Sequence, residues 1–321
     1  MKELMLAAEI GGTKLQIALG TPQGAIVERI KGQSPASEGA DAVLAWFNEQ
    51  IPHLLRRAGA AGACVVGMGV GFGGPVESAT GRVLVSHQVN GWENIALKAW
   101  FEDRFSLPVT ISNDSNAAGW AEYCLGAGRG ARQFFYMNVG SGIGGALVID
   151  GKLYDGQGRG AAEIGHTYVT DWTAPLPGAI AKLEDLCSGW SIERRARRSA
   201  PPVEGTPLHK LWSRNQQRIT CAILAEAARR GDPRAAAEMG RIAESIAIAI
   251  SNVLALFHPE NIVVGGGLSL VGDVLFTPLR DAVARYVFGP YRDRYKILPS
   301  ELGEDVVLAG GQQQSGPQRP A

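Results

Sequence analysis

The chain has 321 residues, of which 45% are hydrophobic and 19% charged, a length that favours two domains over one. Its 31 basic and 31 acidic residues cancel, which argues against a nucleic-acid surface, and no uninterrupted apolar run approaches the ~18 residues of a membrane span. The four cysteines lie far apart, without the spacing of a disulfide framework or a cysteine metal site. We therefore expect a cytoplasmic protein that binds neither nucleic acid nor a membrane.

The first part of the chain alternates predicted strands and helices. Apolar patterns predict strands at 4–8, 15–19, 64–70 and 107–111. The glycine turn Gly11-Gly12-Thr13-Lys14 separates the first two strands, and a helix is expected at about 40–50. Such alternation is typical of an α/β fold.

A second copy of this opening pattern follows a helix predicted at 116–123. Strand 133–139 leads into the turn Gly140-Ser141-Gly142, and strand 145–149 ends at the hairpin signal Asp150-Gly151. The repetition predicts two domains built on one plan.

The last part of the chain is expected to contain a long helix and a third glycine turn. Apolar residues at helical spacing predict a helix at 235–257, and strand 261–264 runs into Gly265-Gly266-Gly267. The basic run at 194–198 is interpreted as a solvated helix face. The polar tail at 312–321 is expected to be disordered.

Two glycine-rich stretches, 69–74 and 140–145, match the pattern G-x-G-x-x-G. In dinucleotide-binding proteins the third glycine opens a helix, whereas here one stretch continues into Pro75-Val76 and the other into a strand. The chain also lacks the Gly-Lys-Ser/Thr ending of a P-loop. Backbone N–H groups in a glycine turn can still hold phosphate oxygens. One such turn is more often only a tight turn, but three turns after strands favour polyphosphate binding.

Six short motifs, taken in order, resemble the ROK family of sugar kinases and sugar-responsive repressors. They span Glu9–Lys14, Asn113–Ala117, Gly126–Gly130, Val139–Gly145, Glu163–His166 and Gly265–Gly267. The resemblance runs from about residue 4 to residue 311. It implies an actin-like (ribonuclease H-like) α/β fold in which two domains of duplicated plan close over a central cleft. The smaller domain would comprise 1–115 with a C-terminal segment near 305–321, and the larger domain 116–304.

The same resemblance implies ATP and a hexose as substrates and assigns residues to each. Gly11, Gly12, Thr13 and Lys14 would form the first phosphate loop, Ser141 and Gly142 the second, and Gly266 and Gly267 would lie near the adenosine. Glu9 would orient Mg²⁺ through a water molecule. The residues expected to contact the sugar are Gly74, Asn113, Asp114, Glu163, His166 and Glu184.

Asp114 is the expected general base, which would take the proton of a sugar hydroxyl as this hydroxyl attacks the γ-phosphate. Phosphoryl transfer requires mainly positioning, charge neutralisation and one such carboxylate. Read alone, Asn113-Asp114 ahead of a helix is more often a helix cap, and His166 more often a core or helix-end histidine.

The chain departs from the family at several positions. Many members hold a structural zinc with the histidine of Glu-x-Gly-His and three cysteines, but those cysteine positions align here with Pro175, Pro177 and Lys182. These side chains do not suit a tetrahedral zinc site, so we predict no structural zinc. Glu9 replaces the usual aspartate. Gln88 and the turn Asn90-Gly91-Trp92 differ at positions that would border the sugar.

The sequence thus predicts an ATP-dependent hexose kinase, by resemblance a homodimer, with glucose (giving glucose 6-phosphate) as the default substrate. N-acetylmannosamine, N-acetylglucosamine, fructose and allose are alternatives. The rival of another class is a non-catalytic sugar-sensing regulator. Family repressors carry a helix-turn-helix ahead of the first glycine loop, which here begins at residue 11, so we expect an enzyme. A kinase-like protein that binds sugar without turnover is a third reading, disfavoured by Asp114 and the three loops.

Overall fold

The computed structural model describes residues 2–34, 38–86 and 89–315, and its contacts divide the chain into two compact units. Unit 1 is drawn from residues 1–130, 146–162 and 301–321, and unit 2 from 131–145 and 163–300. Both units combine strands and helices. The domain boundaries 1–115 with 305–321, and 116–304, stay a proposal.

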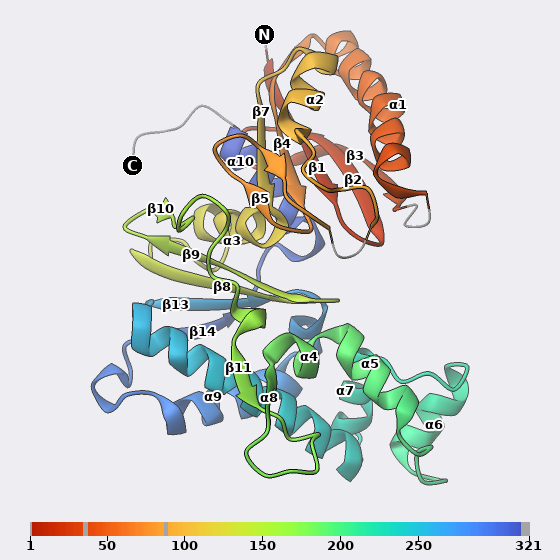
Figure 1. Ribbon diagram of the computed structural model, residues 1–321, viewed down its shortest axis with the longest axis vertical. Coiled ribbons are helices and arrows are strands. Elements are labelled where there is room, and N and C mark those ends of the chain that lie inside the picture. Colours follow the sequence, from red (N-terminus) through yellow and green to blue (C-terminus); the bar gives the residue numbers. More distant parts are fainter. Residues whose placement is uncertain (1, 35–37, 87–88, 316–321) are drawn as a thin grey trace. The chain divides into compact units, whose positions relative to one another are not determined.

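Unit 1 contains a five-stranded sheet of order β3-β2-β1-β4-β7 (Figure 1). Its strands are β1 (Lys2–Ile10), β2 (Lys14–Gly20), β3 (Ile26–Gln33), β4 (Ala63–Phe72) and β7 (Val109–Asn113). β2 runs antiparallel to β1 and β3, whereas β1, β4 and β7 are parallel, with Ile10 beside Phe72 and Phe72 beside Asn113. The carboxyl ends of three parallel strands therefore meet at one edge of this sheet.

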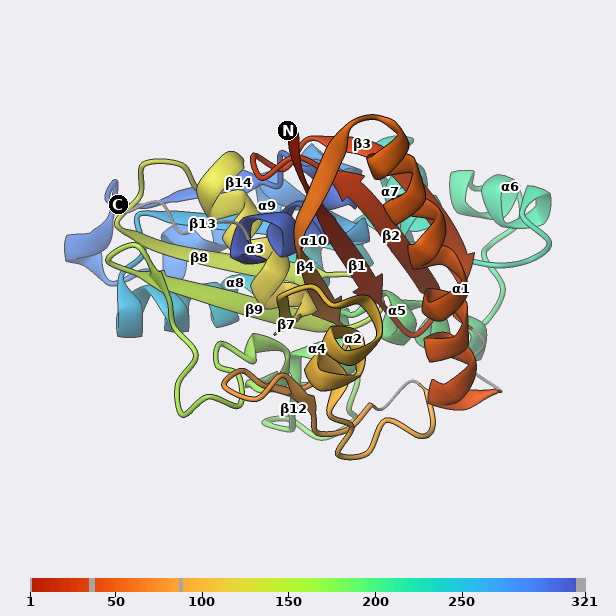
Figure 2. The same ribbon diagram turned by 90° about the horizontal axis from the view of Figure 1, so that it is seen from above.

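Helices cover both faces of the unit 1 sheet (Figure 2). On one face lie α1 (Gly39–Ala60) and α2 (Leu97–Phe105), whose Phe47 and Phe101 are fully buried in one cluster with Leu6 of β1. On the other face lie α3 (Asp114–Leu125) and α10 (Val306–Ser315), where Leu308 packs on Ala7 and Ala18. Alternate residues of β1 thus enter two different apolar layers, as the pleat of a strand dictates.

Helix α10 approaches the sheet closely because glycines face it. A Cβ atom added to Gly69 would lie 2.0 Å from the carbonyl oxygen of Gly311, and one added to Gly71 would lie 2.3 Å from Val307. Within the first G-x-G-x-x-G stretch, these two glycines therefore serve packing inside β4.

Short elements complete unit 1. These are β5 (Val76–Glu77), β6 (Arg82–Val83), β10 (Lys152–Leu153) and the 3-10 turn η4 (Gly303–Asp305). β10 pairs antiparallel with the end of β9 (Ile143–Ile149), and the turn between them places Asp150 at φ +47° and Gly151 at φ +77°. Both angles are positive, as in the hairpin turn expected from Asp-Gly.

The second five-stranded sheet has the order β10-β9-β8-β13-β14. In unit 2, β13 (Asn261–Gly265) lies between β8 (Gln133–Val139) and β14 (Lys296–Pro299) and runs parallel to both. A separate ribbon consists of β11 (Tyr168–Thr170) and β12 (Ile180–Lys182). The helices are α4 (Leu183–Cys187), α5 (Gly189–Arg198), α6 (Pro207–Arg214), α7 (Cys221–Arg229), α8 (Pro233–Phe257) and α9 (Asp273–Tyr286), with 3-10 turns η1 (Ile164–His166), η2 (Gly267–Val271) and η3 (Gly289–Tyr291).

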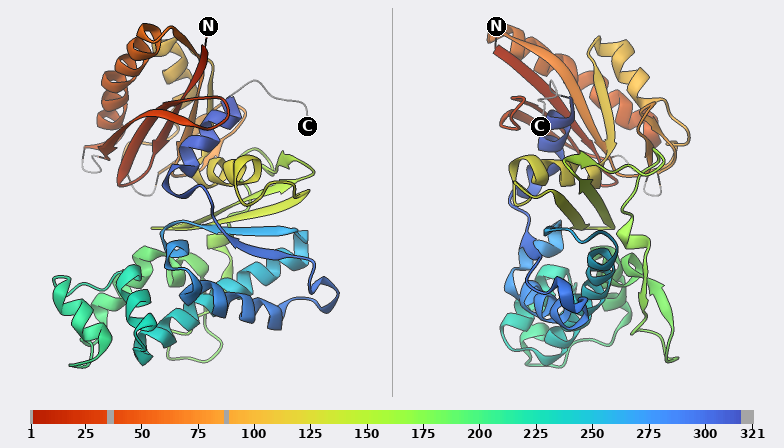
Figure 3. Two further views of the ribbon diagram at one scale, coloured as in Figure 1. Left: turned by 180° about the vertical axis from the view of Figure 1, so that it is seen from behind. Right: turned by 90° about the vertical axis from the view of Figure 1, so that its left-hand side faces the viewer.

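Helix α8 is the central helix of unit 2 and packs beside α9 (Figure 3). Its stripe of Met239, Ile242, Ile246, Ile250 and Leu254 is at most 1% exposed. Among the described residues it is the one helix long and apolar enough, by length and composition, to cross a membrane. Half of that apolar window is buried within the protein, so the apolar character is accounted for by a core position.

Three sequence expectations about individual elements need correction. The helix expected at 40–50 extends to Ala60, because Leu54 and Ala58 continue the buried face beyond Pro52. Residues 312–315 of the tail belong to α10, and Gln312 is fully buried, so disorder was wrong there; residues 316–321 lie outside the described part. Within the basic run, Arg197 and Arg198 are exposed as expected, whereas the Arg195 side chain is only 20% exposed: it donates from Nε and Nη2 to Glu238 and stacks over Trp172.

Candidate functional site

The carboxyl edge of the unit 1 sheet gathers the expected site residues of that unit. The first glycine turn is closed by a hydrogen bond from Gly11 N–H to the Lys14 carbonyl (3.0 Å). Gly73 N–H donates to the Ile10 carbonyl (2.8 Å), which holds the segment after β4 against the end of β1. Ligands of α/β sheets bind at such carboxyl edges.

Asn113 is the N-cap of α3. Its Oδ1 accepts hydrogen bonds from the backbone N–H groups of Ser115 (2.9 Å) and Asn116 (3.3 Å). Its Nδ2 donates to the Gly74 carbonyl (3.1 Å). The capping interpretation of Asn113 is therefore correct, and the same side chain fixes Gly74 next to the start of α3.

Asp114 is the first residue of α3, and its carboxylate has a defined orientation. Oδ1 accepts from the Ser115 backbone N–H (2.7 Å) and from Ser115 Oγ (3.3 Å). The other oxygen, Oδ2, faces Gly73, where an added Cβ would lie 3.5 Å away. This is an ordinary van der Waals distance, so Gly73 and the Asp114 carboxylate are neighbours. The Ser115 contacts thus fix the orientation of the Asp114 carboxylate at the start of α3.

Glu9 lies in β1 one residue before its end. Its Oε2 accepts from Gln16 Nε2 (2.7 Å) and forms an ion pair with Lys14 Nζ (3.2 Å). Within residues 2–34, 38–86 and 89–315, this hydrogen bond and this ion pair of Glu9 both involve Oε2. Oε1 is a hard oxygen ligand of the type that Mg²⁺ and its water shell prefer, so the residues present fit a water-mediated magnesium site.

The second glycine turn lies in unit 2 and is held on two sides. Gly140 N–H donates to the Gly142 carbonyl (2.9 Å), and Gly189 N–H donates to the Gly140 carbonyl (2.8 Å). Glu184 Oε2 accepts from the Ile143 backbone N–H (2.6 Å), and a Cβ on Gly142 would lie 2.7 Å from this oxygen. Ser141 at the tip is exposed. Glu184, expected as a sugar contact, binds the turn with one oxygen.

A cluster of charged side chains lies around η1. Glu163 is exposed at the surface, but partial desolvation of its carboxyl by the surrounding protein raises its pKa; the charge of His166 lowers this pKa and that of Glu184 raises it. His166 is the last residue of η1 and is exposed. It is therefore a histidine at a helix end and not one in the core. Its Nδ1 lies 3.2 Å from Lys182 Nζ. The structure thus groups Glu163, His166, Glu184 and Lys182.

The residues at the family's zinc positions do not fit a zinc ion. Pro175 and Pro177 have no side chains that could bind a metal, and the Lys182 ammonium, which is no zinc ligand, lies 3.2 Å from His166 Nδ1. Within residues 2–34, 38–86 and 89–315, no group of three or more His, Cys, Asp or Glu side chains could hold a metal ion.

The two glycines of the third glycine turn differ in the space that the protein leaves for a side chain. Gly266 has φ +80°, and an added Cβ would lie 2.6 Å from the Val139 carbonyl oxygen, so the packing requires glycine. A Cβ on Gly267 would meet nothing within 4 Å. Protein packing therefore leaves space at Gly267.

Some contributors to these sites were not singled out from the sequence. Gly73, Gln16 and the contact of Lys182 with His166 become visible only once the strands and loops are placed. The signal for Gln16 was its spacing of two from Lys14 along β2, which puts both on one face. Gln88 lies outside the described residues. Trp92, in the turn Asn90-Gly91-Trp92, is 1% exposed and packs edge-on against Phe72, so its side chain belongs to the core.

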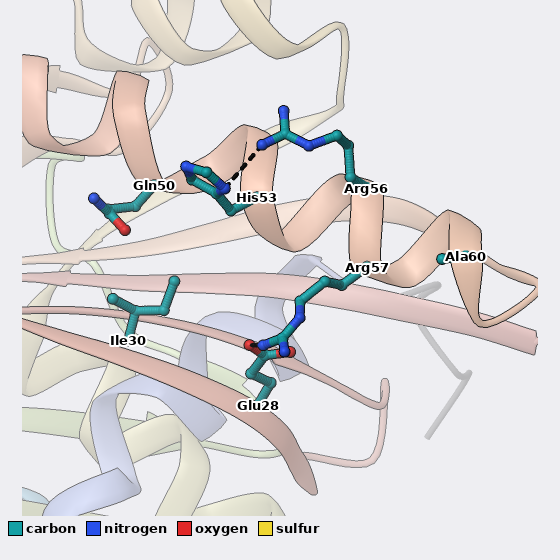
Figure 4. A pocket seen from close by; sticks show the side chains of 7 residues that line it. All are labelled: Glu28, Ile30, Gln50, His53, Arg56, Arg57 and Ala60. Carbon is teal, nitrogen blue, oxygen red and sulfur yellow. Dashed lines mark hydrogen bonds and ion pairs between the residues drawn. The ribbon is translucent and has the colours of Figure 1, made fainter.

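Two recesses of about 500 Å³ each lie away from these residues. One, between β3 and α1, is lined by Glu28, Ile30, Gln50, His53, Arg56, Arg57 and Ala60 (Figure 4). There Arg57 pairs with Glu28, and Arg56 Nη2 lies 2.8 Å from His53 Nδ1. The other lies beside Trp172, Arg195 and Arg241 in unit 2. None of the expected site residues lines either recess.

Comparison with known proteins gives consistent matches over nearly the whole chain. The sequence profile described as ROK family matches residues 5–313. The glucokinase of Thermotoga maritima is 28% identical over 308 residues, which cover 95% of each chain. The solved ROK family glucokinase of Streptomyces griseus, in complex with glucose and AMPPNP, has a TM-score of 0.81 at 28% identity and covers 97% of this chain and 99% of that one. The xylose repressor of Caldicellulosiruptor bescii is 24% identical over 95% of this chain and 76% of its own length.

Proposed function

Because the chain belongs to the ROK family and has its actin-like α/β fold, we propose that it is an ATP-dependent sugar kinase that phosphorylates a hexose hydroxyl. The observation that carries the proposal is the arrangement of Asp114: one oxygen is held by Ser115, and the other faces Gly73 at the carboxyl edge of the sheet. A general base needs a carboxylate of fixed orientation, which the contacts of Oδ1 with Ser115 supply.

In the proposed reaction Asp114 accepts the proton of the attacking hydroxyl. Asn113 and Gly74 are proposed to contact the sugar, and the Asn113 amide already fixes the Gly74 carbonyl. Glu163, His166 and Glu184 are proposed to supply carboxylates and an imidazole for its hydroxyls. A set of fixed donors and acceptors of this kind discriminates strongly among hydroxyl patterns.

ATP is the proposed phosphoryl donor. Gly11, Gly12, Thr13 and Lys14 form the first phosphate loop and Ser141 and Gly142 the second, with Gly266 and Gly267 near the adenosine. The open space at Gly267 supports the last assignment, since no protein atom lies where its side chain would be. Mg²⁺, oriented by Glu9 through water, would supply charge neutralisation at the phosphates.

Glucose is the first substrate to test, because relatives similar over nearly the full length are named glucokinases. N-acetylmannosamine, N-acetylglucosamine, fructose and allose complete the panel. We further propose a homodimer in the cytoplasm that binds neither nucleic acid nor a membrane. Size-exclusion chromatography with light scattering tests the dimer.

The direct experiment measures ADP release from Mg-ATP in the presence of each hexose in turn. Turnover with at least one hexose supports the kinase. The alternative is a sugar-sensing regulator, and the similarity to a xylose repressor is the observation that supports it. Binding of a sugar by calorimetry with no ADP release for any hexose would support this alternative, or a sugar-binding protein without turnover, and would refute the kinase.

A further inference from the structure

The contact between Lys182 and His166 has a defined chemistry. Lys182 Nζ lies 3.2 Å from His166 Nδ1. A charged ammonium has three N–H donors and no acceptor, so the contact is a hydrogen bond only when Nδ1 carries no proton. A neutral imidazole with a bare Nδ1 carries its proton on Nε2. The geometry therefore selects one of the two neutral tautomers.

The backbone on either side holds this pair together. Lys182 ends β12 directly opposite Tyr168 of β11. The residues that follow each partner are also joined, because Leu183 N–H donates to the Thr167 carbonyl (2.9 Å). Thr167 Oγ1 in turn donates to the Ile164 carbonyl (2.7 Å) and ties the chain back onto η1. The two side chains thus project from segments that are hydrogen-bonded immediately beside them.

The tautomer matters because the neighbouring groups are acceptors. Glu163 and Glu184 interact electrostatically with each other, and Glu163 also with His166. An ionised carboxylate only accepts hydrogen bonds, whereas a sugar hydroxyl both donates and accepts. An Nε2–H donor adds the capacity that the two carboxylates lack.

We propose that Lys182 is a positioning residue that replaces the absent metal: its ammonium holds His166 as the Nε2–H tautomer, which donates to a hydroxyl oxygen of the sugar. The inference rests on the proposed function for its sugar. Lys182 stands at a position where the family has a cysteine ligand, so a fixed cation takes the place of a metal site. In this proposal the Lys182 ammonium supplies, beside His166, the positive charge that the zinc ion supplies in the family.

The tautomer can be measured without any activity. Long-range ¹H–¹⁵N correlation spectra of the labelled protein distinguish the two ring nitrogens, and a His166→Gln variant identifies the His166 signals. We expect the Nε2–H form in the wild type, a mixture of tautomers in Lys182→Met, and the Nε2–H form again in Lys182→Arg. Lys210→Met, at an exposed position of α6, is the matched control and leaves the spectrum of His166 unchanged.

Steady-state kinetics tests the consequence for the sugar. Lys182→Met should raise the sugar KM by roughly tenfold, the order expected for one hydrogen bond, while the ATP KM and the melting temperature stay close to wild type. Lys182→Arg should restore most of the sugar affinity. A tautomer in Lys182→Met identical to wild type, or stoichiometric zinc found by elemental analysis of the purified protein, would overturn the positioning role. These two results do not depend on turnover, so they separate failure of this inference from failure of the kinase proposal.

Discussion

The two strand–glycine–strand turns, one in each unit, share a sequence design but are held in different ways. In unit 1 the turn closes on itself through Gly11 and Lys14, and the nearby carboxylate, Glu9, belongs to the strand that enters the turn. In unit 2 the turn closes through Gly140 and Gly142, and the carboxylate of Glu184 comes from helix α4 and binds the backbone of Ile143.

The difference shows that a repeated backbone plan does not fix the role of the charges around it. In unit 1 the Oε2 atom of Glu9 contacts two side chains, those of Lys14 and Gln16. In unit 2 the Oε2 atom of Glu184 instead accepts a hydrogen bond from the backbone N–H of Ile143. We infer that unit 1 carries the reacting carboxylate and unit 2 a rigid turn, and the following predictions test this division.

The largest expected effect is in unit 1. Asp114→Asn keeps the shape and the acceptor for Ser115 N–H but removes the base, so kcat should fall by about 10²- to 10⁴-fold with sugar binding retained. Asp103→Asn, on the exposed side of α2, is the matched control. Near-normal turnover of Asp114→Asn, measured by coupled ADP release, would remove Asp114 from its role.

The next effect is structural and belongs to unit 2. Glu184→Ala removes a hydrogen bond between a carboxylate and the Ile143 N–H, and should lower the free energy of unfolding by about 1.5–3 kcal/mol. Urea denaturation measures this loss, and Asp185→Ala, at the exposed neighbouring position, is the control. Equal stabilities of the two variants would show that Glu184 does not hold the turn.

The third turn offers a comparison between adjacent glycines. Gly266→Ala must accommodate φ +80° and a contact of 2.6 Å, and should destabilise unit 2 by about 1–3 kcal/mol. Gly267→Ala meets no protein atom, so its melting temperature should match wild type while the ATP KM rises several-fold. An unchanged ATP KM in Gly267→Ala would argue against its place near the adenosine.

The smallest effect concerns the pH dependence of stability. The pKa of Glu163 is raised above its ordinary value of 4.5, chiefly by partial desolvation of the carboxyl of this exposed residue. Between 4.5 and the raised value the folded protein holds a proton that the unfolded chain has released, so the stability contributed by this group falls as pH rises and then levels off. Glu163→Gln should remove this decline, as urea unfolding from pH 4 to pH 7 would show. A decline that persists unchanged in the variant would assign it to another group.

Much of this organisation could be predicted from the sequence, for identifiable reasons. Strand β1 was predicted from the alternation of its apolar residues and β4 from a nearly continuous apolar run, which is typical of buried parallel strands. The Asp150-Gly151 hairpin was predicted because its residues tolerate positive φ. The length of α1 was not predicted, because a proline inside a helix normally ends it and only the tertiary packing of Leu54 and Ala58 shows otherwise.

The site was predicted as a set of residues but not as a set of contacts. Asn113 and Asp114 were recognised from one motif, yet their separate duties, cap and approachable carboxylate, depend on atoms of Ser115 and Gly73. Likewise, the loss of the cysteines predicted a missing metal site, but nothing in the spacing indicated that Lys182 would lie against His166. Side-chain contacts across loops depend on three-dimensional placement, which local patterns do not encode.

The measurement that tests the central claim most directly is a single-turnover reaction in which Mg-ATP and a hexose are mixed with excess protein and both products are quantified. The account predicts one hexose phosphate for each ADP with the wild-type protein, and a rate slower by about 10²- to 10⁴-fold with Asp114→Asn. ADP without a hexose phosphate, or equal rates for the two proteins, would contradict it.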